Sequence, residues 1–95
     1  WGKKKFEGAG ESTVRVMENL SDHETVVEIR AVDVPGILHY LTRRISRQGL
    51  NIHSARVATW GHEVRDVFYI TNSGGNRLTE EQIDSLTAAL QVGEE

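Results

Sequence analysis

The 95-residue sequence has no cysteine, a single proline and no long run of apolar residues. The lack of cysteine excludes disulfide bonds, thiolate metal ligands and a cysteine nucleophile. No stretch approaches the roughly 20 consecutive apolar residues that cross a membrane as a helix. The formal net charge of −3 argues against a protein that binds nucleic acid by neutralising phosphates. The sequence therefore predicts a small cytoplasmic module whose partners are neither a membrane nor a nucleic acid.

Lysine occurs only at positions 3–5, within a glycine-rich start that begins at Trp1. This start lacks the apolar segment of a signal peptide. We predict that residues 1–11 form a flexible lead or linker and that residues 12–95 form one domain, taken from a longer protein. Because the lysines lie in the lead, the predicted domain is more acidic than the total charge indicates.

The hydrophobic pattern predicts an α+β fold with the element order β-β-α-β-β-α. This order matches a ferredoxin-like unit, an antiparallel sheet with two helices on one face, except that its last strand is missing. We expect the first strand to take that edge position by pairing with the second strand. The predicted strands span residues 13–17, 26–32, 50–60 and 63–71, and the predicted helices span 36–48 and 79–93.

Three local patterns make finer predictions. The alternation of residues 50–60 slips in phase, which predicts a β-bulge near His53-Ser54. Residues 67–70 are apolar on both faces, which favours a central strand that is covered on both sides. Thr79 and Gln82 have the spacing of a capping box at the start of the second helix. In the first helix, apolar spacing assigns Ile37, Leu38, Leu41 and Ile45 to the buried face.

Residues with catalytic or metal-binding chemistry do not form known motifs. The four histidines, His23, His39, His53 and His62, lack the spacing of zinc ligands. No serine lies in a nucleophile motif, and no glycine pattern matches a dinucleotide-binding loop. We therefore predict no catalytic residue, no metal site and no cofactor, and no enzymatic activity for this chain by itself.

The turn Asp33-Val34-Pro35-Gly36 is the most informative feature. It places backbone N–H groups at a helix N-terminus, where carboxylates bind favourably. Gly36 allows a ligand to approach the main chain without meeting a Cβ atom. The alternative interpretation is a plain strand-to-helix turn.

The run from Asp33 to Leu38, followed by Leu41 and by Gly49-Leu50-Asn51-Ile52, resembles the D-x-P-G-x-L…G-x-N-I pattern of ACT domains. ACT domains are small ferredoxin-like regulatory modules that often bind amino acids. This resemblance identifies the superfamily better than it identifies the parent protein.

Residues 51–61 and 66–71 extend the resemblance to the C-terminal ACT domains of bacterial bifunctional uridylyltransferase/uridylyl-removing enzymes. Those enzymes modify the nitrogen regulatory protein PII and sense glutamine. The resemblance covers about residues 12–91. The departures are Trp60 in place of a usual tyrosine, Val34 in place of a usual arginine, and a loop lengthened by Gly74-Gly75.

The resemblance implies an amino-acid-sensing domain that responds to glutamine. It implies an effector loop whose backbone amides face the ligand carboxylate, formed by Asp33, Val34, Pro35, Gly36, Ile37 and Leu38. Asp33 would either pair with the ligand's ammonium group or cap the helix amides.

The resemblance also implies a second ACT domain as a partner, in a homodimer or as a tandem copy. Asn51 and Ile52 of that neighbour would close the effector site, and His53 would line it. Two alternatives remain open: an assembly module that binds no ligand, and an ACT domain from an alarmone synthetase/hydrolase.

Overall fold

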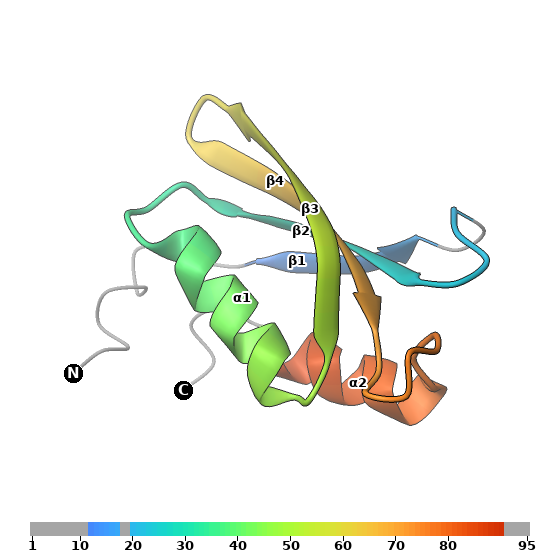
Figure 1. The fold of residues 1–95 in the computed structure, drawn as a ribbon. Helices are drawn as coiled ribbons and strands as arrows, with labels where there is room; N and C mark the ends of the chain where they lie inside the picture. The colour runs from blue at the N-terminus through green and yellow to red at the C-terminus, as the bar shows by residue number, and fades with distance from the viewer. Residues whose placement is uncertain (1–11, 18–19, 91–95) are drawn as a thin grey trace.

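The computed structural model describes residues 12–17 and 20–90, and it confirms the predicted element order (Figure 1). The predicted lead, residues 1–11, lies outside the described residues. The second helix ends at Ala89, so the prediction that it continues to Gly93 is wrong. The elements are β1 (Thr13–Met17), β2 (Thr25–Val32), α1 (Ile37–Arg47), β3 (Asn51–Trp60), β4 (Glu63–Thr71) and α2 (Glu80–Ala89).

The four strands form one sheet in the order β1-β2-β4-β3, and each neighbouring pair is antiparallel. The edge strand β1 pairs with β2 from Thr13 opposite Arg30 to Met17 opposite Val26. The first strand thus takes the edge position that the last strand has in a ferredoxin-like unit, as predicted. Both helices lie on the same face of the sheet (Figure 1).

The predicted bulge is present in β3. Ile52 lies opposite Ile70 of β4, whereas Ser54 lies opposite Tyr69, so the register shifts between these two positions. His53 is the residue left without a partner in the register. The shift accounts for the phase slip in the sequence. The extra residue reverses the alternation, so each later side chain of β3 points to the face opposite to that expected for a regular strand.

The hydrophobic core lies between the sheet and the two helices. Phe68 at the centre of β4 is fully buried opposite Val27 of β2. The two helices each contribute residues four positions apart, which lie on one helix face. These are Leu41 and Ile45 from α1, and Leu86 and Leu90 at the end of α2. Leu38 does not belong to this face, since it is 40% exposed.

The prediction that β4 is covered on both faces is wrong. Phe68 points toward the helices, but Val67 and Tyr69 lie on the other face and are only half-buried. Neither helix reaches that face, which we call the open face (Figure 1).

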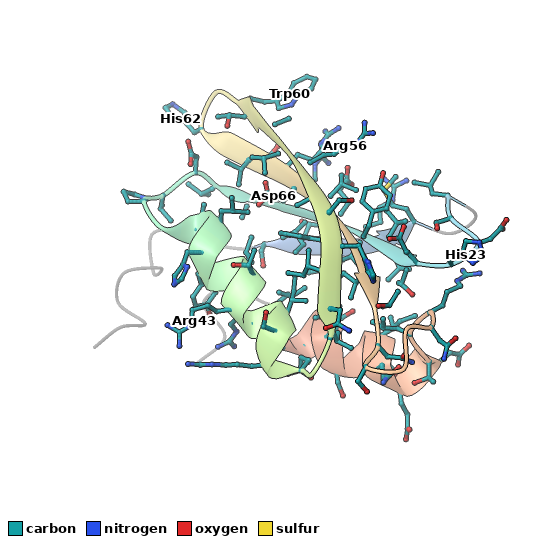
Figure 2. The ribbon with its side chains drawn as sticks, in the orientation of Figure 1. His23, Arg43, Arg56, Trp60, His62 and Asp66 are labelled. Atoms are coloured by element: carbon teal, nitrogen blue, oxygen red, sulfur yellow. The ribbon has the colours of Figure 1, made fainter. Side chains whose placement is uncertain are left out.

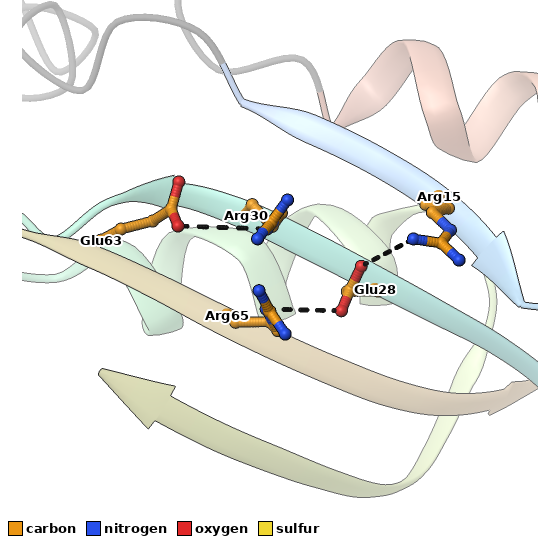
Figure 3. A network of polar contacts seen from close by, with 5 residues as sticks. All are labelled: Arg15, Glu28, Arg30, Glu63 and Arg65. Atoms are coloured by element: carbon orange, nitrogen blue, oxygen red, sulfur yellow. Dashed lines mark ion pairs between the residues drawn. The ribbon is translucent and has the colours of Figure 1, made fainter. Parts of the chain in front are cut away.

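Ion pairs cross the open face (Figure 3). A carboxylate oxygen of Glu28 lies 4.0 Å from Arg15 on one side and its other oxygen lies 3.5 Å from Arg65 on the other. A second pair joins Arg30 to Glu63 at 4.0 Å. These contacts link β1, β2 and β4, and they give the buried Glu28 side chain two cationic partners.

Candidate functional site

The turn between β2 and α1 is held by backbone hydrogen bonds. The Asp33 amide donates to the His62 carbonyl at 2.7 Å, which ties the turn to the β3–β4 hairpin. The Ile37 amide donates to the Val34 carbonyl at 3.1 Å. Gly36 has a φ of 82°, in the left-handed region that side chains disfavour, so this turn requires glycine.

The N-terminus of α1 has no side-chain cap. Gly36 is the N-cap residue, no side chain accepts a hydrogen bond there, and the first turn contains no acidic residue. The interpretation of Asp33 as the helix cap is therefore wrong. Among the described residues, the backbone amides of Leu38 and His39 donate no hydrogen bond. The predicted free donors are thus present at this helix end.

In contrast to α1, the N-terminus of α2 is capped by side chains of this chain. The Gln82 amide donates to Thr79 Oγ1 at 3.1 Å, and the Thr79 amide donates to Gln82 Oε1 at 2.9 Å. This confirms the predicted capping box. Glu80 and Glu81 also stand in the first turn of α2, where negative charge complements the helix dipole. The start of α1 has none of these features.

A buried carboxyl group lies at the same end of the sheet as the start of α1 (Figure 2). Asp66 is 1% exposed and points toward the helices, between Ile29 of β2 and Val57 of β3. Neither of its carboxylate oxygens has a hydrogen-bond partner among the described residues. Burial, with a smaller contribution from the charge of Asp33, raises the pKa of Asp66 from 3.8 to about 6.

Sequence reasoning overlooked Asp66 as a candidate for function. It treated the residue only as part of a motif, although a signal was present. Asp66 alternates in the strand with Val64 and Phe68, so all three side chains point to the same face of the sheet, and Val64 and Phe68 face the core. An acidic residue at an inward position of a central strand is unusual and points to a specific role.

The structure separates the two groups of predicted site residues. Asp33–Leu38 follow the end of β2, at the sheet end where Val32 lies opposite Glu63. Asn51, Ile52 and His53 begin β3 at the other end of the sheet, where Asn51 lies opposite Thr71. One chain therefore does not bring the two groups together.

The residues at the start of β3 have partners within the chain. Asn51 Nδ2 donates to the Asn72 carbonyl at 3.4 Å, and His53 Nε2 lies 2.8 Å from Thr71 Oγ1. Ile52 is half-buried against the core. Asn51 and His53 are nevertheless exposed, so they remain accessible to a neighbouring molecule.

An open cleft of about 560 Å³ lies away from the turn before α1. It is formed by the end of α1, the start of β3 and the first turns of α2. None of the predicted site residues lines this cleft. Its lining residues are Gln48, Leu50, Glu81, Gln82, Asp84 and Ser85.

Within residues 12–17 and 20–90, no group of three or more His, Asp or Glu side chains is arranged to hold a metal ion. In the same part of the chain, neither helix is long and apolar enough to cross a membrane.

The fold and the turn before α1 together match one protein family. The model of the ACT domain family matches residues 25–88, from the first residue of β2 almost to the end of α2. The chain belongs to the ACT domain family, whose members are regulatory domains.

Among individual proteins, the chain is similar to bifunctional uridylyltransferase/uridylyl-removing enzymes. It is 48% identical to the enzyme of Rhodopseudomonas palustris over 69 residues, which is 73% of this chain and 7% of that protein. It is 49% identical to the enzyme of Nitrobacter hamburgensis, with the same coverage. It is 39% identical to an enzyme of Acinetobacter baumannii over 82 residues, which is 86% of this chain and 9% of that protein. The chain thus spans less than a tenth of the length of these relatives.

Proposed function

We propose that this chain is the ligand-binding regulatory domain of a larger cytoplasmic enzyme and performs no catalysis by itself. Its effector is an amino acid, glutamine by analogy with the resemblance above. The regulated reaction is the addition and removal of uridylyl groups on the PII protein. Ligand binding favours one arrangement of ACT domains over another, and this preference biases the catalytic domains to which the chain is joined.

One observation carries this proposal. The N-terminus of α1 offers unbonded amides at Leu38 and His39, next to a left-handed glycine that exposes the main chain. A carboxylate satisfies such donors and complements the positive end of the helix dipole. The capping box of α2 shows that this sequence is able to close a helix end with its own side chains.

A second ACT domain completes the proposed site. Because Asn51, Ile52 and His53 lie at the opposite end of the sheet from Asp33–Leu38, they close the effector loop of a neighbour rather than their own. The Asn51 amide suits this role, since it both donates and accepts hydrogen bonds. The neighbour is a second copy in a homodimer or a tandem ACT domain.

Substitution of Gly36 tests the effector loop. We expect titration calorimetry to show L-glutamine binding to the wild-type chain, and Gly36→Ala to weaken that binding by about tenfold or more, equivalent to at least ~1.4 kcal/mol. The new Cβ contacts no protein atom within 4 Å, so the effect comes from backbone strain at a φ of 82° and from obstruction of the ligand.

Gly75→Ala is the matched control. Gly75 has nearly the same dihedral angle, with a φ of 81°, and open space around the position of a new Cβ. It lies in the loop before α2, away from the turn into α1. Equal binding by Gly36→Ala and the wild type, with Gly75→Ala also unchanged, would reject Asp33–Leu38 as the effector loop.

A second candidate function is assembly without a ligand. The edge strand β3 favours it, because nearly all of its residues are exposed, including Val57 at 52% and Trp60 at 64%. Exposed apolar side chains on an unpaired edge are typical of surfaces that associate. In that case the oligomeric state depends on β3 and remains the same with and without amino acids.

A further inference from the structure

Asp66 differs from the other buried polar residues of the described chain. Ser12 Oγ donates to the Leu90 carbonyl at 3.0 Å, and Thr25 Oγ1 accepts from the Leu78 amide at 2.9 Å. Thr71 contacts His53, and Glu28 pairs with two arginines. Among the buried polar residues that the structure describes, Asp66 alone has neither a hydrogen bond nor an ion pair for its side-chain oxygens.

The surroundings of Asp66 do not explain this isolation. Its neighbours across the strands are the aliphatic side chains of Ile29 and Val57. The charged group that acts on it is Asp33, which repels it. Leaving a carboxylate buried and unpaired costs free energy that an aliphatic residue at the same position would not. A stabilising role in the fold is therefore a poor explanation for Asp66.

Groups suited to the two ends of a dipolar ligand occur toward the same end of the sheet, because Asp66 lies three residues along β4 from Glu63, which is opposite Val32 at the end of β2. The start of α1 presents amide donors and the positive end of the helix dipole. Asp66, 99% removed from solvent and pointing into the same helix-facing layer, presents two acceptor oxygens without donors. Asp33, in the turn from β2 into α1, adds a second negative charge that acts on Asp66.

We propose that Asp66 binds the ammonium group of an α-amino acid whose carboxylate binds the amides of Leu38 and His39. This inference rests on the proposed function and names the group that determines its ligand class. Asp66 is then a specificity-determining residue. It selects amino acids that have a free ammonium group over compounds with the same carboxylate and side chain that lack it.

Exposed residues lie next to Asp66 on the edge strand and in the turn that follows β2. Val57, beside it on the edge strand, is 52% exposed. Asp33, Pro35 and Gly36, in the turn after β2, are also exposed. A bound ammonium group would supply the hydrogen bonds that the carboxylate lacks and would neutralise the repulsion with Asp33.

The test compares ligands that differ only in the ammonium group. The twenty proteinogenic amino acids are titrated against the 95-residue chain by calorimetry, and the tightest ligand is then compared with its desamino analogue, in which hydrogen replaces the ammonium group. We expect the wild type to prefer the amino acid by at least about tenfold, as for a charge-assisted hydrogen bond. Asp66→Asn is expected to abolish this preference, so that the variant binds both ligands with about equal affinity, because the neutral amide no longer attracts the cation.

Asp84→Asn is the matched control, since it makes the same substitution at an exposed position of α2. It should keep the wild-type preference. As a second measurement, the Asp66 carboxyl group of the wild type is titrated by NMR with and without the ligand. Binding should lower the pKa of Asp66, because a nearby ammonium group favours the carboxylate.

The outcomes separate this inference from the proposed function. If another amino acid binds in place of glutamine and its ammonium preference depends on Asp66, the inference holds and glutamine is rejected. If an amino acid binds and Asp66→Asn keeps the preference, the inference is rejected while amino-acid sensing stands. If none of the twenty binds, the inference is rejected.

Discussion

Asp66→Asn is expected to remove about 3 kcal/mol of pH-dependent destabilisation between about pH 4 and pH 8. The wild-type pKa is about 6 in the folded state against 3.8 for an ordinary aspartate. The folded protein therefore holds this proton more tightly than the unfolded chain does. The resulting stabilisation is fully present below about pH 4 and is lost as the pH rises through about 6. Asparagine carries no titrating proton, so the variant lacks this loss.

Urea unfolding at a series of pH values measures the effect. The free energy of unfolding of the wild type should fall more steeply above pH 4 than that of Asp66→Asn, and the two curves should separate until about pH 8. Asp84→Asn serves as the control, because the same change on an exposed surface should leave the wild-type slope intact. Parallel curves for the wild type and Asp66→Asn would show that Asp66 is not the buried, unpaired acid described above.

Phe68→Ala is expected to lower the free energy of unfolding by about 3–5 kcal/mol. The ring is fully buried at the centre of β4, and its removal leaves a cavity between the sheet and both helices. This loss is a large fraction of the roughly 5–15 kcal/mol that stabilises a typical small domain. Thermal or urea denaturation of the purified chain measures it.

Tyr69→Ala supplies the comparison, since Tyr69 is the next residue of the same strand and points to the open face. Its loss should cost only about 1 kcal/mol, because a half-buried ring loses fewer contacts. A Tyr69→Ala effect as large as that of Phe68→Ala would mean that another layer covers the open face in solution.

The sequence predicted most of the fold because its signals are local. Alternation and helical spacing located the six elements, and the phase slip located the bulge at His53. The edge position of β1 was predicted because this position belongs to the last strand in a ferredoxin-like unit. The apolar run in β4 led to a wrong prediction, because Val67 and Tyr69 are only half-buried on the open face, which neither helix covers.

The site was less predictable because it depends on contacts between distant residues. Spacing alone placed Leu38 in the core, but the turn at Gly36 starts the helix so that Leu38 is exposed next to the free amides. The burial of Asp66 depends on how β4 pairs with β2 and β3. Asn51 and Asp33 lie at opposite ends of the sheet, and only the strand register shows this.

The central claim is that an amino acid effector binds at the turn from β2 into α1. The most direct test follows the backbone amide resonances of the ¹⁵N-labelled chain while L-glutamine is added. We predict that the largest shifts occur at Gly36, Leu38 and His39, where the helix end has no side-chain cap. Shifts confined to the residues that line the cleft, such as Gln48 and Ser85, or no shifts at saturating glutamine, would contradict the account.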